Sequence, residues 1–111
     1  MAIAATERSG EGGSVETLDS RDVRALTQYL TVLDDVGRAR DAEDLYLVVS
    51  ESGNEYLVDA RAGTCECPDH RYRECRCKHL RRVAFATGER EIPAWVDREA
   101  VDDQLGLHVR G

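Results

Sequence analysis

Apolar residues in the first third of the chain recur at the spacing of one helical face. Val23, Leu26, Leu30 and Leu33 are three or four residues apart, so in a helix they would form a single stripe. The pattern therefore predicts an amphipathic helix within residues 19–40. We expect its stripe to pack as core, because a β-hairpin needs a covering layer to be stable in water.

Two short apolar runs then predict an antiparallel β-hairpin. Residues 45–49 read Leu-Tyr-Leu-Val-Val, residues 56–58 read Tyr-Leu-Val, and Ser-Gly-Asn at 52–54 supplies turn residues between them. A second turn at 61–63 precedes an extended segment at 64–67. This segment would lengthen the hairpin into a meander.

The last regular element predicted is a helix that starts near Lys78 and ends at Gly88. Leu80, Val83 and Ala84 fit one helical face, and glycine is common at helix C-termini. The expected fold class is α+β. It is a small domain with an antiparallel β-hairpin or meander and a C-terminal helix, and the preceding amphipathic helix is packed on it.

The expected domain organisation follows from these elements. Residues 1–18 are rich in Gly, Ser and Glu and lack periodicity, which predicts a disordered tail. Residues 45–88 form the central module, and residues 89–111 form a C-terminal extension. In that extension Trp95 is expected to be a core plug that packs near the central module.

Two pairs of potential metal ligands stand out within the central module. Cys65 and Cys67, and then Cys77 and His79, are each separated by one residue. On a strand, residues i and i+2 face the same side, whereas on a helix they lie about 200° apart. We therefore expect Cys65 and Cys67 on an extended segment, Cys77 just before the second helix, and His79 in its first turn. Sulfur and imidazole ligands favour a tetrahedral Zn²⁺, and four protein ligands make the zinc structural.

Cys75 and His70 leave other ligand sets open. Cys75 and Cys77 repeat the C-x-C spacing, so an all-cysteine site with His79 spare, or an iron–sulfur centre, would use the same segment. His70 is either an alternative nitrogen ligand or a solvent-exposed loop residue. All four cysteines fall within thirteen residues, which favours a metal site over a disulfide framework that joins distant segments.

The charge distribution sets a basic segment within an acidic chain. The 111 residues include 22 acidic and 15 basic side chains, for a net charge of −7. This acidity, with Arg in excess over Lys, indicates a protein adapted to a salty cytoplasm, where salt screens the repulsion between carboxylates. Residues 65–82 are instead basic. Their cations are candidates for nucleic-acid binding, or else a solvated face that offsets thiolate charge: Arg71, Arg73, Arg76, Lys78, Arg81 and Arg82.

The ligand pattern resembles a known family, the SWIM-type zinc finger. C-x-C, a spacer and then C-x-H, with two preceding strands and the helix start Leu80-Arg81-Arg82-Val83, match it over roughly residues 45–88. The acidic, stand-alone form is similar to small haloarchaeal SWIM proteins. The resemblance implies that Cys65, Cys67, Cys77 and His79 hold one zinc in a β-hairpin-plus-helix module that binds DNA or other proteins. The N-terminal helix lies outside that module.

The expected function is recognition without catalysis. A catalytic zinc needs an open ligand position and a general base, and only Glu66 or Asp69 would be at hand. The partner is a protein or DNA. No membrane association and no small-molecule substrate are expected, and the absence of a signal peptide and the thiol content favour the cytoplasm. The alternatives are a redox-sensitive thiol/zinc switch, in which Cys75 is oxidised with Cys77 and zinc is released, and an enzyme subunit.

Overall fold

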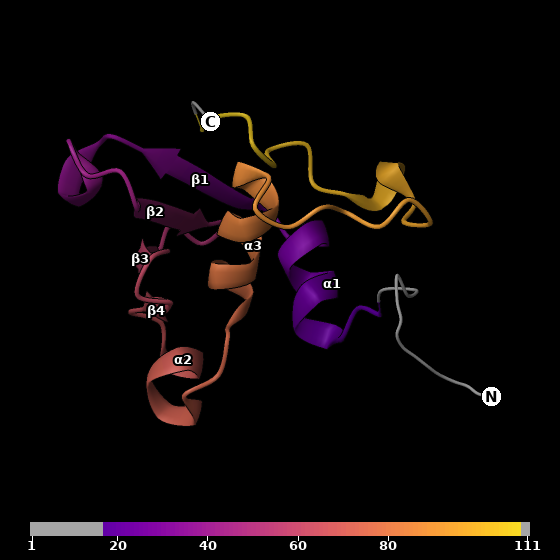
Figure 1. The fold of residues 1–111 in the computed structure, drawn as a ribbon, viewed down its shortest axis with the longest axis horizontal. Helices are drawn as coiled ribbons and strands as arrows, with labels where there is room; N and C mark the ends of the chain where they lie inside the picture. The colour runs from indigo at the N-terminus through magenta and orange to yellow at the C-terminus, as the bar shows by residue number, and fades with distance from the viewer. Residues whose placement is uncertain (1–16, 110–111) are drawn as a thin grey trace.

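The computed structural model describes residues 17–109, and its centre is a four-stranded antiparallel sheet. The strands follow one another in space in their order along the chain, β1-β2-β3-β4, so the sheet is a simple meander (Figure 1). Their bounds are β1 Leu30–Asp34, β2 Leu45–Ser50, β3 Glu55–Asp59 and β4 Thr64–Cys65. The predicted α+β class and the hairpin of β2 and β3 are confirmed.

One face of this sheet carries the main core. The register places Val32 opposite Val48, Tyr46 opposite Val58, and Val58 opposite Cys65, and these side chains share a face because strand residues alternate. Helix α3 (Lys78–Thr87) lies across that face (Figure 1). The buried apolar side chains between them are Leu30, Val32, Val48, Val58, Leu80 and Val83.

Helix α1 (Ser20–Thr27) packs against α3, so that α3 lies between the sheet and α1 (Figure 1). Ala25 and Leu26 of α1 form a second, smaller core with Phe85. The N-terminal helix is therefore used as core, as predicted. Its support for the sheet is indirect, through α3.

The predicted N-terminal helix is wrong beyond Thr27. The backbone of Gln28 is extended, and Leu30, which was assigned to the helical stripe, begins strand β1. Leu30 and Val32 alternate into the core at the two-residue period of a strand. The backbone of this segment pairs with β2, which satisfies hydrogen-bonding groups that an edge of the sheet would otherwise leave to solvent.

The segment between the two ligand pairs also differs from the prediction. Helix α2 (Pro68–Arg73) contains His70, for which the sequence suggested either a ligand role or a solvent-exposed position in a loop. Pro68 is at the first helical position of α2, where its missing N–H leaves no hydrogen bond unmade. The predicted end of α3 is confirmed: Gly88 has φ 84° in the left-handed region, which favours glycine.

The C-terminal extension is held to the core by a residue other than Trp95. Trp95 is 60% exposed, so the expectation of a core plug is wrong. Asp102 makes the attachment: its N–H donates to the Leu26 carbonyl (2.8 Å), and its carboxylate accepts from the Leu30 N–H (3.2 Å). The predicted tail, residues 1–18, lies mostly outside the described residues. Within residues 17–109 no helix has the length and apolarity to cross a membrane.

Candidate metal centre

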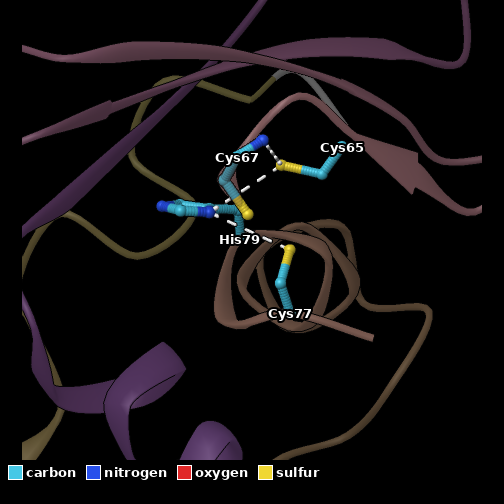
Figure 2. A group of neighbouring side chains, drawn as sticks. All are labelled: Cys65, Cys67, Cys77 and His79. Atoms are coloured by element: carbon cyan, nitrogen blue, oxygen red, sulfur yellow. Dashed lines mark hydrogen bonds between the residues drawn. The ribbon is translucent and has the colours of Figure 1, made fainter. Parts of the chain in front are cut away.

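The donor atoms of Cys65, Cys67, Cys77 and His79 converge in one buried cluster. All four lie within 4.8 Å of one another, and none of the four residues is more than 5% exposed. Figure 2 shows the three sulfur atoms gathered around one ring nitrogen of His79. This nitrogen, Nδ1, is 3.8 Å from the Cys65 sulfur and 3.9 Å from the Cys77 sulfur.

The first ligand pair sits where the sheet gives way to α2. Cys65 ends β4 opposite the core residue Val58, so its side chain points into the core. Cys67 is the N-cap of α2 in extended conformation, and its sulfur accepts the N–H of His70 (3.4 Å). The N–H of Cys67 in turn donates to the sulfur of Cys65 (3.4 Å). The extended backbone thus places both sulfurs on one side, as the i, i+2 spacing predicts.

The second pair uses the start of α3. Cys77 is the N-cap of this helix and His79 is in its first turn, as predicted. The ring of His79 packs against Tyr56 of β3, with ring centroids 4.6 Å apart. This contact fixes the imidazole with Nδ1 turned toward the thiols, so that the sheet and the helix together orient the fourth donor.

The thiols influence one another's protonation. Interaction with Cys77, together with burial, raises the pKa of Cys65, and burial raises the pKa of Cys67. The pKa of Cys77 is lowered, because its thiolate would accept hydrogen bonds from Cys65 and His79 and from the Leu80 N–H at the helix start. Three buried thiols of this kind need a cation to become thiolates together, and a coordinated dication deprotonates them.

The cluster fits a metal ion such as zinc. Tetrahedral zinc has Zn–S of about 2.3 Å and Zn–N of about 2.0 Å, which separates donor atoms by roughly 3.5–3.8 Å. The sulfur–nitrogen distances of 3.8 and 3.9 Å are close to this range. Three sulfurs and one imidazole nitrogen are also the donor types that zinc prefers.

Neither Cys75 nor His70 belongs to this cluster. The thiol of Cys75 is half-buried and donates to the backbone carbonyl and the carboxylate of Asp69, both at 3.6 Å. His70 lies in α2 and its Nδ1 is 2.7 Å from the Cys75 carbonyl oxygen. These two residues hold the loop between α2 and α3 in shape, and the structure brings only the preferred ligand set together.

Two of the six predicted nucleic-acid contacts are not available to a partner. Arg82 is 0% exposed, and its guanidinium donates to the carbonyls of Ala25, Gln28 and Leu30 and to the carboxylate of Asp102. Its guanidinium is therefore occupied by acceptors of the protein itself and does not reach the surface.

Arg81 is likewise engaged, with its side chain 14% exposed and paired with Asp19 and Asp22 of the α1 start. The remaining members, Arg71, Arg73 and Arg76, are exposed. Lys78 is half-buried and donates to the side-chain oxygen of Gln28 (2.6 Å).

Two arginines that the sequence analysis did not select lie near the cluster. Arg21 of α1 donates two hydrogen bonds to the carboxylate of Asp69 in α2 (2.8 and 3.1 Å), and this pair holds the pKa of Asp69 down at about 2. Arg21 and Arg24, one turn apart in α1, both line a hollow that also reaches Cys67 and His79. No local pattern signals this arrangement, since α1 and α2 are distant in sequence and only the folded core brings them together.

Comparison with known proteins identifies no relative of this chain. No family model matches it, and neither does any curated protein or solved structure. The buried cluster of three cysteines and one histidine is therefore the observation on which a function rests.

Proposed function

We propose that the protein is a SWIM-type recognition module stabilised by one structural Zn²⁺, held by Cys65, Cys67, Cys77 and His79. The observation that carries this proposal is the convergence of three thiols and one imidazole nitrogen in a buried site. Cys65 belongs to β4 and His79 to α3, while Cys67 and Cys77 are the N-caps of α2 and α3. A metal bound there would join the sheet to the helix, so its binding free energy would become folding free energy.

The proposed module is not an enzyme. Four protein donors fill a tetrahedral shell and leave no position for water or substrate. Glu66 accepts hydrogen bonds from Arg38 at 2.8 Å, which holds its pKa down at about 2. Asp69 is held in the same way by Arg21. A carboxylate with so low a pKa is a poor general base near neutral pH.

The proposed partner is a nucleic acid or another protein. The proposed location is a reducing cytoplasm with a high salt concentration. A reducing compartment keeps three free thiols available as zinc ligands, and the described cysteines form no disulfide. The acidic composition supports the salty setting, because screening by salt lowers the cost of a net charge of −7.

Metal content of the protein purified under reducing conditions tests this proposal. We expect one zinc per chain in the wild type, none in Cys77→Ala, and one in the matched control Cys75→Ala, whose thiol lies outside the cluster. Wild-type protein without zinc, or with iron and sulfide, would overturn the ligand assignment. Loss of zinc from the Cys75 variant alone would assign the site to a different set of sulfurs.

A further inference from the structure

A hollow of about 520 Å³ opens beside the cluster, between α1, α2 and the first turn of α3. Among residues 17–109, four cationic side chains and one carboxylate line it. Tyr56 and Tyr72 add aromatic rings to its wall. The charged side chains are Arg21, Arg24, Arg73, Lys78 and Asp69.

Positive charge is in excess in this hollow. The carboxylate of Asp69 is already matched by the two hydrogen bonds from Arg21. Arg73 approaches Asp69 only at 3.8 Å, with 73% of its side chain exposed. Arg24 is exposed and its side chain makes no hydrogen bond or ion pair with any residue of the described range 17–109.

The zinc site accounts for only part of this charge. A zinc bound by three thiolates and a neutral imidazole carries a net charge of −1, which one cation balances. Arg24, Arg73 and Lys78 remain after Arg21 is matched with Asp69. They concentrate positive charge on one face of a chain whose net charge is −7, and such a face attracts anions.

An aromatic ring stands in solvent beside these cations. Tyr72 of α2 is 87% exposed. Since α2 buries none of its residues, packing within the protein does not explain an aromatic side chain at this position. Exposed rings next to cations are what single-stranded nucleic acid requires, because each base has a face that stacks and each phosphate carries a charge.

A second hollow shares Lys78 with the first. It has a volume of about 720 Å³ and is also lined by the end of α1 and the turn between β2 and β3. Tyr29, 49% exposed, lines that second hollow. We call the two hollows, both of which are lined by Lys78, the track. The first hollow carries Arg24, Arg73 and Tyr72, and the second carries Tyr29 and one carboxylate, that of Glu51.

We infer that this track binds a single-stranded nucleic acid. Its phosphates lie against Arg24, Arg73 and Lys78, and its bases stack on Tyr72 and Tyr29. A duplex hides the faces of its bases, and a polyglutamate has no ring to stack on Tyr72 or Tyr29, so neither uses both the cations and the rings of the track. The inference rests on the proposed function, because the metal ligands Cys67 and Cys77 fix the helix starts that form the hollow.

Binding of a fluorescein-labelled oligothymidylate tests the cationic part of the track. A length of about ten nucleotides suits a groove of this kind. We expect Arg24→Gln with Arg73→Gln to weaken binding about tenfold or more, and to lower the slope of log K against log salt by roughly 1.4, for two lost phosphate contacts. The matched control, Arg40→Gln with Arg98→Gln, changes the net charge equally at exposed sites away from the track, and should bind as the wild type does.

Tyr72→Ala tests the stacking part, with an expected weakening of at least about fivefold. An equal loss of affinity in both double variants would overturn the track, and so would unlabelled polyglutamate that displaces the strand as well as unlabelled oligothymidylate does. Zinc is measured in each protein. Zinc-loaded protein that does not bind the strand at low salt would overturn the track and leave the metal module standing. Protein that binds the strand but contains no zinc would overturn the metal module and leave the track standing.

Discussion

Arg82 joins three parts of the chain through one buried guanidinium. It donates to the carbonyls of Ala25 and Gln28 at the end of α1, and to the carbonyl of Leu30 at the start of β1. The last carbonyls of a helix have no partner within the helix, and here an arginine supplies one. Burial lowers the pKa of Arg82, while the carboxylate of Asp102 opposes that shift, so the side chain remains charged in the core.

Arg82→Met should destabilise the protein by about 3–5 kcal/mol, because it leaves the Asp102 carboxylate and several carbonyls buried without a donor. Urea unfolding measures the change. The matched control Arg76→Met, at an exposed arginine, should alter the free energy of unfolding by less than about 0.5 kcal/mol. A small effect of the Arg82 change would show that these acceptors find other partners.

Trp95 should contribute little to stability. Its side chain is 60% exposed, so Trp95→Ala is expected to change the free energy of unfolding by no more than about 0.5 kcal/mol. The protein has a single tryptophan, and its fluorescence should show the red-shifted emission of a solvated indole in the folded state. A blue-shifted emission, or a large loss of stability, would place this ring against the core.

At the scale of elements, the start of α1 is closed by a reciprocal cap. The Asp19 carboxylate accepts the Asp22 N–H (2.9 Å), and the Asp22 carboxylate accepts the Asp19 N–H (3.1 Å). Arg81 of α3 contacts both carboxylates. The cap therefore stabilises α1 and also fixes it against α3.

Asp19→Ala should lower the free energy of unfolding by about 1 kcal/mol near neutral pH, the usual cost of losing an N-cap. The Asp22 N–H and Arg81 lower the pKa of Asp19 from 3.8 to about 2. A carboxylate with a lowered pKa stabilises the fold fully above about pH 4, and this contribution is lost as the pH falls toward about 2.

Unfolding of the two proteins across this pH range measures the difference. The difference should be constant above pH 4 and shrink below it. Asp19→Asn keeps an acceptor for the cap and should cost less than the alanine variant. A difference that does not vary between pH 4 and pH 2 would contradict the charge-assisted cap.

Elements with local signals could be predicted from the sequence. The β2–β3 hairpin and α3 have turn residues and apolar periods within a few residues, and Gly88 marks the end of a helix. Residues 23–33 were ambiguous, because Leu30 fits both a helical stripe and the alternation of a strand. Pairing with β2 decides between the two, and that pairing is a tertiary contact which no local pattern contains.

The candidate site likewise has a part with local sequence signals and a part that depends on tertiary contacts. The four metal donors were found because the i, i+2 spacing constrains each pair locally, and Figure 2 shows both pairs meeting. The burial of Arg82 and the hollow beside α1 were not found, because both depend on contacts between segments about 50 residues apart. Charge alone does not distinguish an arginine that meets solvent from one that is buried against carbonyls.

At the scale of the whole molecule, the cysteine donors of the metal site are themselves part of the main hydrophobic core. Cys65, Cys67 and Cys77 pack in one cluster with Val58 and Leu80. The metal site and the sheet share this core, so we expect them to unfold together. Loss of metal should therefore affect the domain as a unit.

Chelation under reducing conditions should lower the midpoint of thermal unfolding by about 10 °C or more, since a few kcal/mol shift a domain of this size by that much. Circular dichroism follows the sheet and the helices together, and added Zn²⁺ should restore the midpoint. A metal-free protein that melts at the temperature of the zinc form would show that the core holds without the ion.

Added salt should raise the midpoint of the zinc-loaded protein. The net charge of −7 opposes compaction in dilute buffer, and salt screens this repulsion. Thermal unfolding over a potassium chloride series measures the effect. A protein equally stable in dilute buffer and in concentrated salt would contradict the proposed adaptation.

The short span of the ligands has a consequence for the order in which the chain assembles. All four donors lie within residues 65–79. Arg82 instead needs contacts with Asp102 and with carbonyls more than 50 residues upstream. The entropic cost of closing a loop rises with its length. An ion captured between residues 65 and 79 needs only local closure, and on a ribosome these residues emerge before Asp102. Metal capture would then nucleate the domain, and the C-terminal extension would lock it last.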